Sequence, residues 1–143
     1  MTEKSLTLVK EAMTINVITF TKKTTASEAL IVLAQHKISG APVIDKNSKV
    51  IGFFTESDIL RYFSVHPNQK LSILDIPIVY SDKLITTTRE TPIYLIQQKF
   101  VEYGLRAIPV VDKNGVLEGI ISRRDVLKYI FLVNQQKKRN HKK

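Results

Sequence analysis

Apolar and polar positions along the chain form two similar blocks, and each block predicts the same order of elements. The first block opens with a short β-prone run at 17–20. Apolar residues at helical spacing follow, namely Ala29, Leu30, Val32 and Leu33. Two apolar runs at 41–45 and 50–54 predict strands joined by a polar turn, and a second helix is expected from about Glu56 to Phe63. The predicted order is β-α-β-β-α.

The second block repeats this order. A short strand is predicted at 84–87, and Thr91-Pro92 is expected to start a helix with the proline at its first position. The apolar face of this helix consists of Ile93, Ile96, Phe100 and Val101. Strands at 107–111 and 116–121 follow, joined by a turn in which Gly115 can adopt a positive φ. The last helix is expected from Arg123 to about Val133.

The two blocks are an internal repeat at a constant offset of 67 residues, from Pro42 to Pro109 and from Gly52 to Gly119. Such a repeat indicates one supersecondary unit built twice. A unit of about 55 residues is marginally stable alone, so we expect a shared core. The expected boundaries are repeat 1 at 11–64, a connector at 65–77, repeat 2 at 78–133 and a basic tail at 134–143. A helix is also expected near the start, around Leu6 to Ala12.

Composition narrows the class of protein. The chain has 143 residues, 43% of them hydrophobic, and no cysteine. A disulfide framework, a thiolate metal site and a cysteine nucleophile are therefore excluded. No apolar run approaches the ~20 residues of a membrane span, and the first residues lack the pattern of a signal peptide. We expect a soluble, cytoplasmic protein.

The net charge of +9 is concentrated at the end of the chain. Five of the last seven residues are Lys or Arg. Without these five, the chain would have 17 Lys and Arg against 13 Asp and Glu, a net charge of +4. We expect this tail to be solvated and disordered, with contact to nucleic acid or an acidic partner as the alternative. It contains no aromatic residue, so base stacking is unsupported.

A hydroxyl residue followed three positions later by aspartate recurs where a strand meets a helix: Thr55 with Asp58, and Ser122 with Asp125. Such a pair is a helix capping box. The same pair could hold a ligand, because a helix N-terminus favours phosphate and a carboxylate can accept hydrogen bonds from ribose hydroxyls. A glycine three residues before each pair, Gly52 and Gly119, would let a ligand approach the backbone. The residues alone leave both readings open.

Catalytic and metal chemistry have little support in the sequence. The histidines, His36, His66 and His141, are scattered, and no carboxylate stands at metal-ligand spacing from them. There is no glycine-rich phosphate loop and no nucleophile elbow. We expect no enzyme activity, no catalytic residue, no metal and no obligatory cofactor.

The motifs in their order resemble a known family. Met13-Thr14 is followed by Val17-Ile18-Thr19, then by the run from Ile38 to Asp45, then by a glycine-led strand that ends in Thr55-x-x-Asp58. This pattern resembles a CBS (cystathionine-β-synthase-type) domain. The chain resembles a tandem CBS pair, or Bateman module, over about residues 11–133. The resemblance implies an α/β (α+β) fold of two β-α-β-β-α repeats packed by pseudo-twofold symmetry.

The resemblance also implies ligand sites. Such pairs bind adenosine-containing ligands in two clefts between the repeats, with Asp58 and Asp125 on ribose hydroxyls and Thr55 and Ser122 on ribose or phosphate. Adenine contacts are expected from the opposite repeat. One cleft would combine Ser122 and Asp125 with Ile18, Ile38, Ser39 and Gly40. The other would combine Thr55 and Asp58 with Ile85, Leu105, Arg106 and Ala107.

The two copies differ in charge. Glu56-Ser57 separates the hydroxyl from the aspartate in the first, and Arg123-Arg124 in the second. Three residues before the proline, the first repeat has Ser39 and the second Arg106, a position from which some family members contact phosphates. Arginine pairs well with phosphate, so a phosphate-rich ligand is expected near the second copy. Arg123 and Arg124 can also be an ordinary solvated first helical turn, although arginine there opposes the helix dipole.

The sequence therefore predicts a stand-alone regulatory module that binds AMP, ADP or ATP, forms a homodimer and signals to an unknown partner protein. NAD and S-adenosylmethionine are further ligand options. Two alternatives remain: a nucleic-acid-associated protein that uses the basic tail, and a structural dimerisation module in which both boxes are only caps. No membrane association is expected.

Overall fold

The computed structural model describes residues 7–66, 75 and 77–141, and it divides into two compact units. The first-repeat unit comprises residues 16–85 with 113–117, and the second-repeat unit comprises 1–15, 86–112 and 118–143. Both contain helices and short antiparallel strand pairs, which confirms the mixed α/β fold class. Of the predicted connector at 65–77, residues 67–74 and 76 lie outside the described residues.

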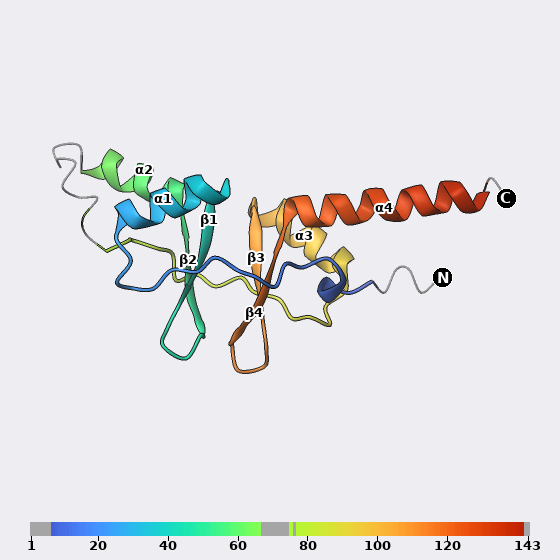
Figure 1. Cartoon of the computed structure of the whole chain (residues 1–143), viewed down its shortest axis with the longest axis horizontal. Helices are drawn as coiled ribbons and strands as arrows, with labels where there is room; N and C mark the ends of the chain where they lie inside the picture. The colour runs from blue at the N-terminus through green and yellow to red at the C-terminus, as the bar shows by residue number, and fades with distance from the viewer. Residues whose placement is uncertain (1–6, 67–74, 76, 142–143) are drawn as a thin grey trace. The chain divides into compact units, whose positions relative to one another are not determined.

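The first-repeat unit is built on an antiparallel hairpin. β1 (Gly40–Ile44) pairs with β2 (Val50–Thr55), with Gly40 opposite Thr55 and a bulge between Val43 and Ile44. α1 (Ala26–His36) and α2 (Glu56–Val65) lie beside this hairpin (Figure 1). Thr25 caps α1 as predicted, since its Oγ1 accepts from Glu28 N at 3.1 Å. The buried core consists of Phe20, Ala26, Ala29, Leu33, Ala41, Val43, Phe54 and Ile78.

The second-repeat unit has the same elements. It contains α3 (Ile93–Tyr103), the β3–β4 hairpin (Ala107–Val111 and Leu117–Ser122) and α4 (Arg123–His141), as Figure 1 shows. Its buried core consists of Val9, Ile93, Ile96, Phe100, Ile108, Val110, Ile121 and Val126. Within the described residues, no helix is both long and apolar enough to cross a membrane.

Several element boundaries differ from the predictions. The leading strands expected at 17–20 and 84–87 are each reduced to one parallel bridge, from Phe20 to Val43 and from Thr87 to Val110. A turn in which Thr24 N donates to Thr21 O follows Phe20 at once. Pro92 lies at the N-cap of α3 rather than at its first helical position, and either place suits a residue without an N–H.

Both ends of the chain also differ from expectation. The helix expected around Leu6 to Ala12 is a single 3-10 turn, η2 (Val9–Glu11), and Leu6 lies outside the described residues. The predicted end of α4 at Val133 and the disordered tail from 134 were wrong for the described part, because α4 continues to His141. No proline or glycine interrupts residues 134–141, and basic residues in the last turn suit the helix dipole.

Each hairpin is completed by a segment that the linear boundaries assign to the other repeat. Ser81 and Phe53 exchange both backbone hydrogen bonds, at 3.1 and 2.9 Å. In the same way Thr14 and Ile120 exchange theirs, at 2.8 and 2.9 Å. The first residues of each repeat therefore pair with the edge of the hairpin of the other repeat.

Two glycines make this exchange possible. A Cβ on Gly52 would lie 2.4 Å from the Tyr80 ring and 2.5 Å from Ser81 O, and a Cβ on Gly119 would lie 2.8 Å from Thr14 O. We expected a ligand to approach the backbone at these glycines. In the structure, the space beside each glycine is taken by Tyr80 and Ser81 or by Met13 and Thr14.

Substitution of Gly52 tests this contact. We expect Gly52→Ala to lower the free energy of unfolding by about 1–3 kcal/mol, since the new methyl group overpacks against backbone and ring atoms. Gly104→Ala is the matched control: a Cβ there meets nothing within 4 Å, and only the positive φ of 62° is strained. Urea denaturation measures both variants. An unchanged free energy of unfolding in Gly52→Ala would contradict a steric role for Gly52.

Candidate functional site: the two helix N-termini

Both predicted ligand motifs lie where a strand runs directly into a helix. β2 ends at Thr55 and α2 begins at Glu56, while β4 ends at Ser122 and α4 begins at Arg123. With no loop between strand and helix, each hydroxyl residue is placed at the helix start and each aspartate falls in the first turn. The sequence order alone therefore fixes the local position of both pairs.

The second-repeat motif forms a complete capping box. Ser122 N donates to Asp125 Oδ2 at 2.8 Å, and Asp125 N donates to Ser122 Oγ at 3.0 Å. In the described part of the chain, the other carboxylate oxygen of Asp125, Oδ1, has no hydrogen-bond partner. The Asp125 carboxylate can therefore cap the helix with one oxygen and still accept from an external donor with the other.

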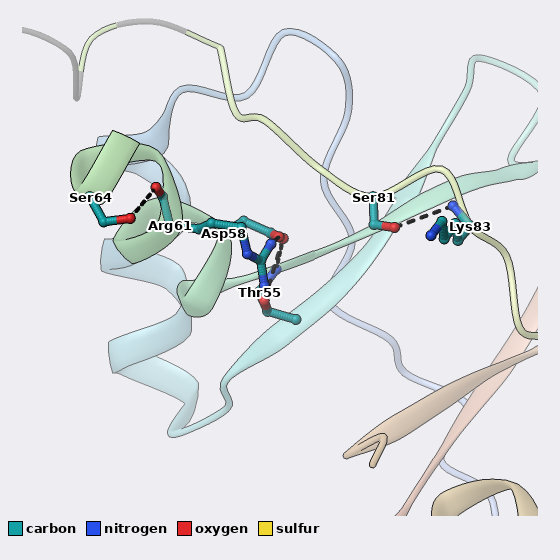
Figure 2. Close-up of polar contacts among 6 residues, drawn as sticks. All are labelled: Thr55, Asp58, Arg61, Ser64, Ser81 and Lys83. Carbon is teal, nitrogen blue, oxygen red and sulfur yellow. Dashed lines mark hydrogen bonds and ion pairs between the residues drawn. The ribbon is translucent and has the colours of Figure 1, made fainter. Parts of the chain in front are cut away.

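The first-repeat motif is arranged differently (Figure 2). Thr55 N donates to Asp58 Oδ2 at 2.8 Å, but the Thr55 hydroxyl makes no cap to the helix and lies 3.4 Å from the same oxygen. Arg61 Nη1 donates a hydrogen bond to Asp58 Oδ1 at 3.0 Å. The Asp58 side chain is only 10% exposed, against 69% for Arg61. Both carboxylate oxygens of Asp58 are thus engaged within the protein.

The segment before each proline lies against the helix N-terminus of its own repeat. Glu56 N donates to Ser39 O at 2.9 Å, and Arg123 N donates to Arg106 O at 3.0 Å. The structure therefore brings Ser39 and Gly40 to the first motif, and Arg106 and Ala107 to the second. Each repeat assembles one motif with one pre-proline segment. The pairing of motif and adenine contacts across the repeats stays a prediction.

The charges around the two motifs are opposite in kind. Arg106, Arg123 and Arg124 are all exposed beside the second motif. Beside the first, the corresponding positions hold Ser39, Glu56 and Ser57, none of which is basic. The second helix N-terminus thus adds three cations to the positive potential of its backbone N–H groups, which favours an anion there.

The four apolar residues predicted to contact adenine differ in how deeply they are buried. Ile18 packs against the first-repeat core and Leu105 against the second, so both already serve the fold. Ile38 is 38% exposed, and Ile85 is partly buried. Of these four, Ile38 has the most free apolar surface to offer a base.

Sequence reasoning missed the contact between Arg61 and Asp58. The signal was present, because carboxylate and arginine three residues apart on a helix are neighbours. The equivalent position in the second repeat is Lys128, and among the described residues Lys128 forms no ion pair with Asp125. The described residues also include no group of three or more His, Asp or Glu side chains that could hold a metal ion.

Comparisons with known proteins agree with this architecture. The family model of the CBS domain matches residues 9–65 and 75–132. Inosine-5'-monophosphate dehydrogenase of Aquifex aeolicus is 32% identical over 122 residues, which cover 83% of this chain but 24% of the dehydrogenase. The chain therefore spans about a quarter of the length of that relative.

Two solved structures are similar over almost their whole length. The CBS domain pair of protein MJ0100, in complex with 5'-methylthioadenosine and S-adenosyl-L-methionine, is 27% identical with a TM-score of 0.72, covering 87% of this chain and 99% of that one. CBSX2 in complex with AMP is 26% identical with a TM-score of 0.74, covering 89% and 98%. Family model, sequence and fold agree, and the chain belongs to the CBS domain family as a tandem pair of CBS domains.

Proposed function

We propose that this chain is a regulatory module that binds an adenosine-containing nucleotide, AMP, ADP or ATP, at its CBS repeats and signals occupancy to a partner protein. Two similar structures are complexes with adenosine ligands, AMP in one and 5'-methylthioadenosine with S-adenosyl-L-methionine in the other. The observation that carries the proposal is Asp125. Its Oδ1 is an acceptor without a partner among the described residues, at a helix N-terminus flanked by three arginines.

The proposal also assigns roles to the neighbouring residues. Asp125 Oδ1 would accept from a ribose hydroxyl, while the exposed Arg106, Arg123 and Arg124 would face the phosphates. Ser122 would hold the carboxylate in place through its backbone N–H and add its hydroxyl to ribose or phosphate. A ligand held this way shifts a conformational equilibrium only by its differential affinity for the two states.

Calorimetric titration with AMP, ADP, ATP, NAD and S-adenosylmethionine tests the proposal. We expect at least one nucleotide to bind, and Asp125→Ala to weaken it about tenfold or more, since a charge-assisted hydrogen bond to ribose is lost. Because Asp125→Ala also removes a helix cap that contributes about 1 kcal/mol, urea denaturation must show that the variant is folded. Asp82→Ala, which removes an exposed carboxylate elsewhere, is the control. Absence of binding by all five ligands, or unchanged affinity in Asp125→Ala, would contradict the proposal.

We also propose that the two motifs bind with unequal affinity, the second more tightly. A ribose hydroxyl at Asp58 would have to share Oδ1 with Arg61 or displace it, whereas Asp125 Oδ1 has no competing donor among the described residues. The acidic Glu56 beside Asp58 further opposes a phosphate at the first motif. An exposed ion pair contributes about 0–1 kcal/mol, so the handicap from Arg61 is modest.

Substitution of Arg61 measures how far its contact with Asp58 weakens ligand binding. We expect Arg61→Ala to strengthen ligand binding at the first motif by up to about fivefold, the equivalent of an ion pair of about 1 kcal/mol. In calorimetry, the weaker of the two binding events would then have a lower Kd. Lys128→Ala, at the equivalent position of the second repeat, should bring no gain. If Arg61→Ala instead weakened binding, Arg61 would be a phosphate contact and not a competitor for Asp58.

The third part of the proposal is a homodimer. Leu60 on α2 and Leu127 on α4 stand 67 residues apart at equivalent positions, and they are 70% and 65% exposed. Val65 and Leu132, also equivalent, are similarly exposed. Large apolar side chains that gather on one kind of helix in both repeats favour burial against a second copy of this chain.

Charged substitutions at these leucines test the dimer. We expect the double variant Leu60→Glu with Leu127→Glu to be monomeric, because burying two carboxylates in an apolar interface is strongly unfavourable. Light scattering of the wild-type chain should give twice the 16.3 kDa of one copy. Val79→Glu, an equally drastic change at an exposed valine outside the helices, should leave the mass unchanged. A monomeric wild-type chain would contradict this part of the proposal.

A further inference from the structure

The end of α4 has no counterpart in the first repeat. α2 has 10 residues and ends at Val65, which corresponds to Leu132, whereas α4 has 19 residues and ends at His141. The part of α4 at residues 134–141, called the basic arm below, is therefore an addition to the duplicated fold. In Figure 1 the red end of α4 extends away from the β3–β4 hairpin.

The basic arm is polar on every side. All of its residues are exposed, and none is apolar or acidic: Asn134, Gln135, Gln136, Lys137, Lys138, Arg139, Asn140 and His141. The only acid anywhere in α4 is Asp125, more than two turns away and engaged at Ser122. Nothing within the helix neutralises the cations of the arm.

The helix dipole explains only part of this charge. Cations in the last turn stabilise a helix by about 0.3–1 kcal/mol each at low salt. Adjacent like charges with no acid within one turn repel one another, and a fully exposed helical end gains little from packing. An external anion would remove that repulsion and hold the arm in its helical form.

The composition of the arm favours a nucleic acid over other anionic partners. A membrane-surface helix needs an apolar face, and the exposed apolar residues of α4 all precede the arm, between Leu127 and Leu132. Protein interfaces are enriched in aromatic residues and depleted of lysine at their core, opposite to this segment. Phosphate backbones are contacted by the donors found here, those of Lys, Arg, Asn and Gln.

We propose that the basic arm binds the phosphate backbone of a double-stranded nucleic acid without reading its sequence. The arm contains no Phe, Tyr or Trp side chain on which unpaired bases could stack, so a duplex fits better than a single strand. Binding of this kind rests on counterion release and must weaken steeply with salt. It would give the module an anchor separate from its proposed nucleotide site.

Fluorescence anisotropy of the full chain with a labelled duplex of about 20 base pairs, as DNA and as RNA, tests this inference. The triple variant Lys137→Ala, Lys138→Ala and Arg139→Ala keeps good helix formers in the arm. We expect it to bind the duplex at least about tenfold more weakly, with the slope of log K against log salt reduced by about three. The matched control removes three exposed lysines elsewhere: Lys22→Ala, Lys23→Ala and Lys46→Ala.

The outcomes separate the explanations. Loss of binding in the arm variant but not in the control, for either duplex, supports the inference, and calorimetry with AMP should then show the same nucleotide affinity in both variants. Equal loss in both variants would mean a net-charge effect and would overturn it. No measurable duplex binding by the wild-type chain, or binding only to vesicles that contain phosphatidylserine, would overturn it as well.

Discussion

The structure depends on a backbone contact at two glycines. Gly52 and Gly119 let the segments at Ser81 and Thr14 approach the hairpins closely enough to form paired backbone hydrogen bonds. Each of these segments also delivers an apolar residue to the core it joins: Ile78 is buried in the first-repeat core and Val9 in the second. Neither hairpin is completed by residues of its own repeat alone. Each unit of the structure therefore combines a hairpin of one repeat with the leading segment of the other.

This exchange of segments positions the candidate sites. The exchanged segments fix one edge of each hairpin, and the hairpin in turn places a hydroxyl and an aspartate at the start of α2 or α4. Local backbone bonds from Glu56 to Ser39 and from Arg123 to Arg106 then hold each pre-proline segment against its helix. The polar groups proposed to meet a nucleotide are thus ordered by contacts that the fold makes in any case.

Capping and ligand binding are compatible uses of the same carboxylate. One oxygen of Asp125 accepts from Ser122 N and stabilises the helix, which leaves the other oxygen oriented and without a partner among the described residues. In the first copy Arg61 takes that second oxygen of Asp58. The two copies therefore differ at the carboxylate oxygen that is proposed to accept from a ribose hydroxyl, although their motifs are similar in sequence. Physical differences of this size, about 1 kcal/mol, are enough to rank two sites without abolishing either.

The sequence by itself determined the duplicated α-β-β-α order, the cap at Thr25 and the location of both motifs, because hydrophobic period and capping chemistry are local properties. It misplaced the end of α4, since residues 134–141 carry the composition of a solvated tail and of an exposed helix equally well. Only the tertiary structure decided which segment completes each hairpin and why Gly52 and Gly119 lack side chains. These depend on atoms brought together from distant or facing positions, and the spacing of residues along a chain does not specify which of the possible partners will meet.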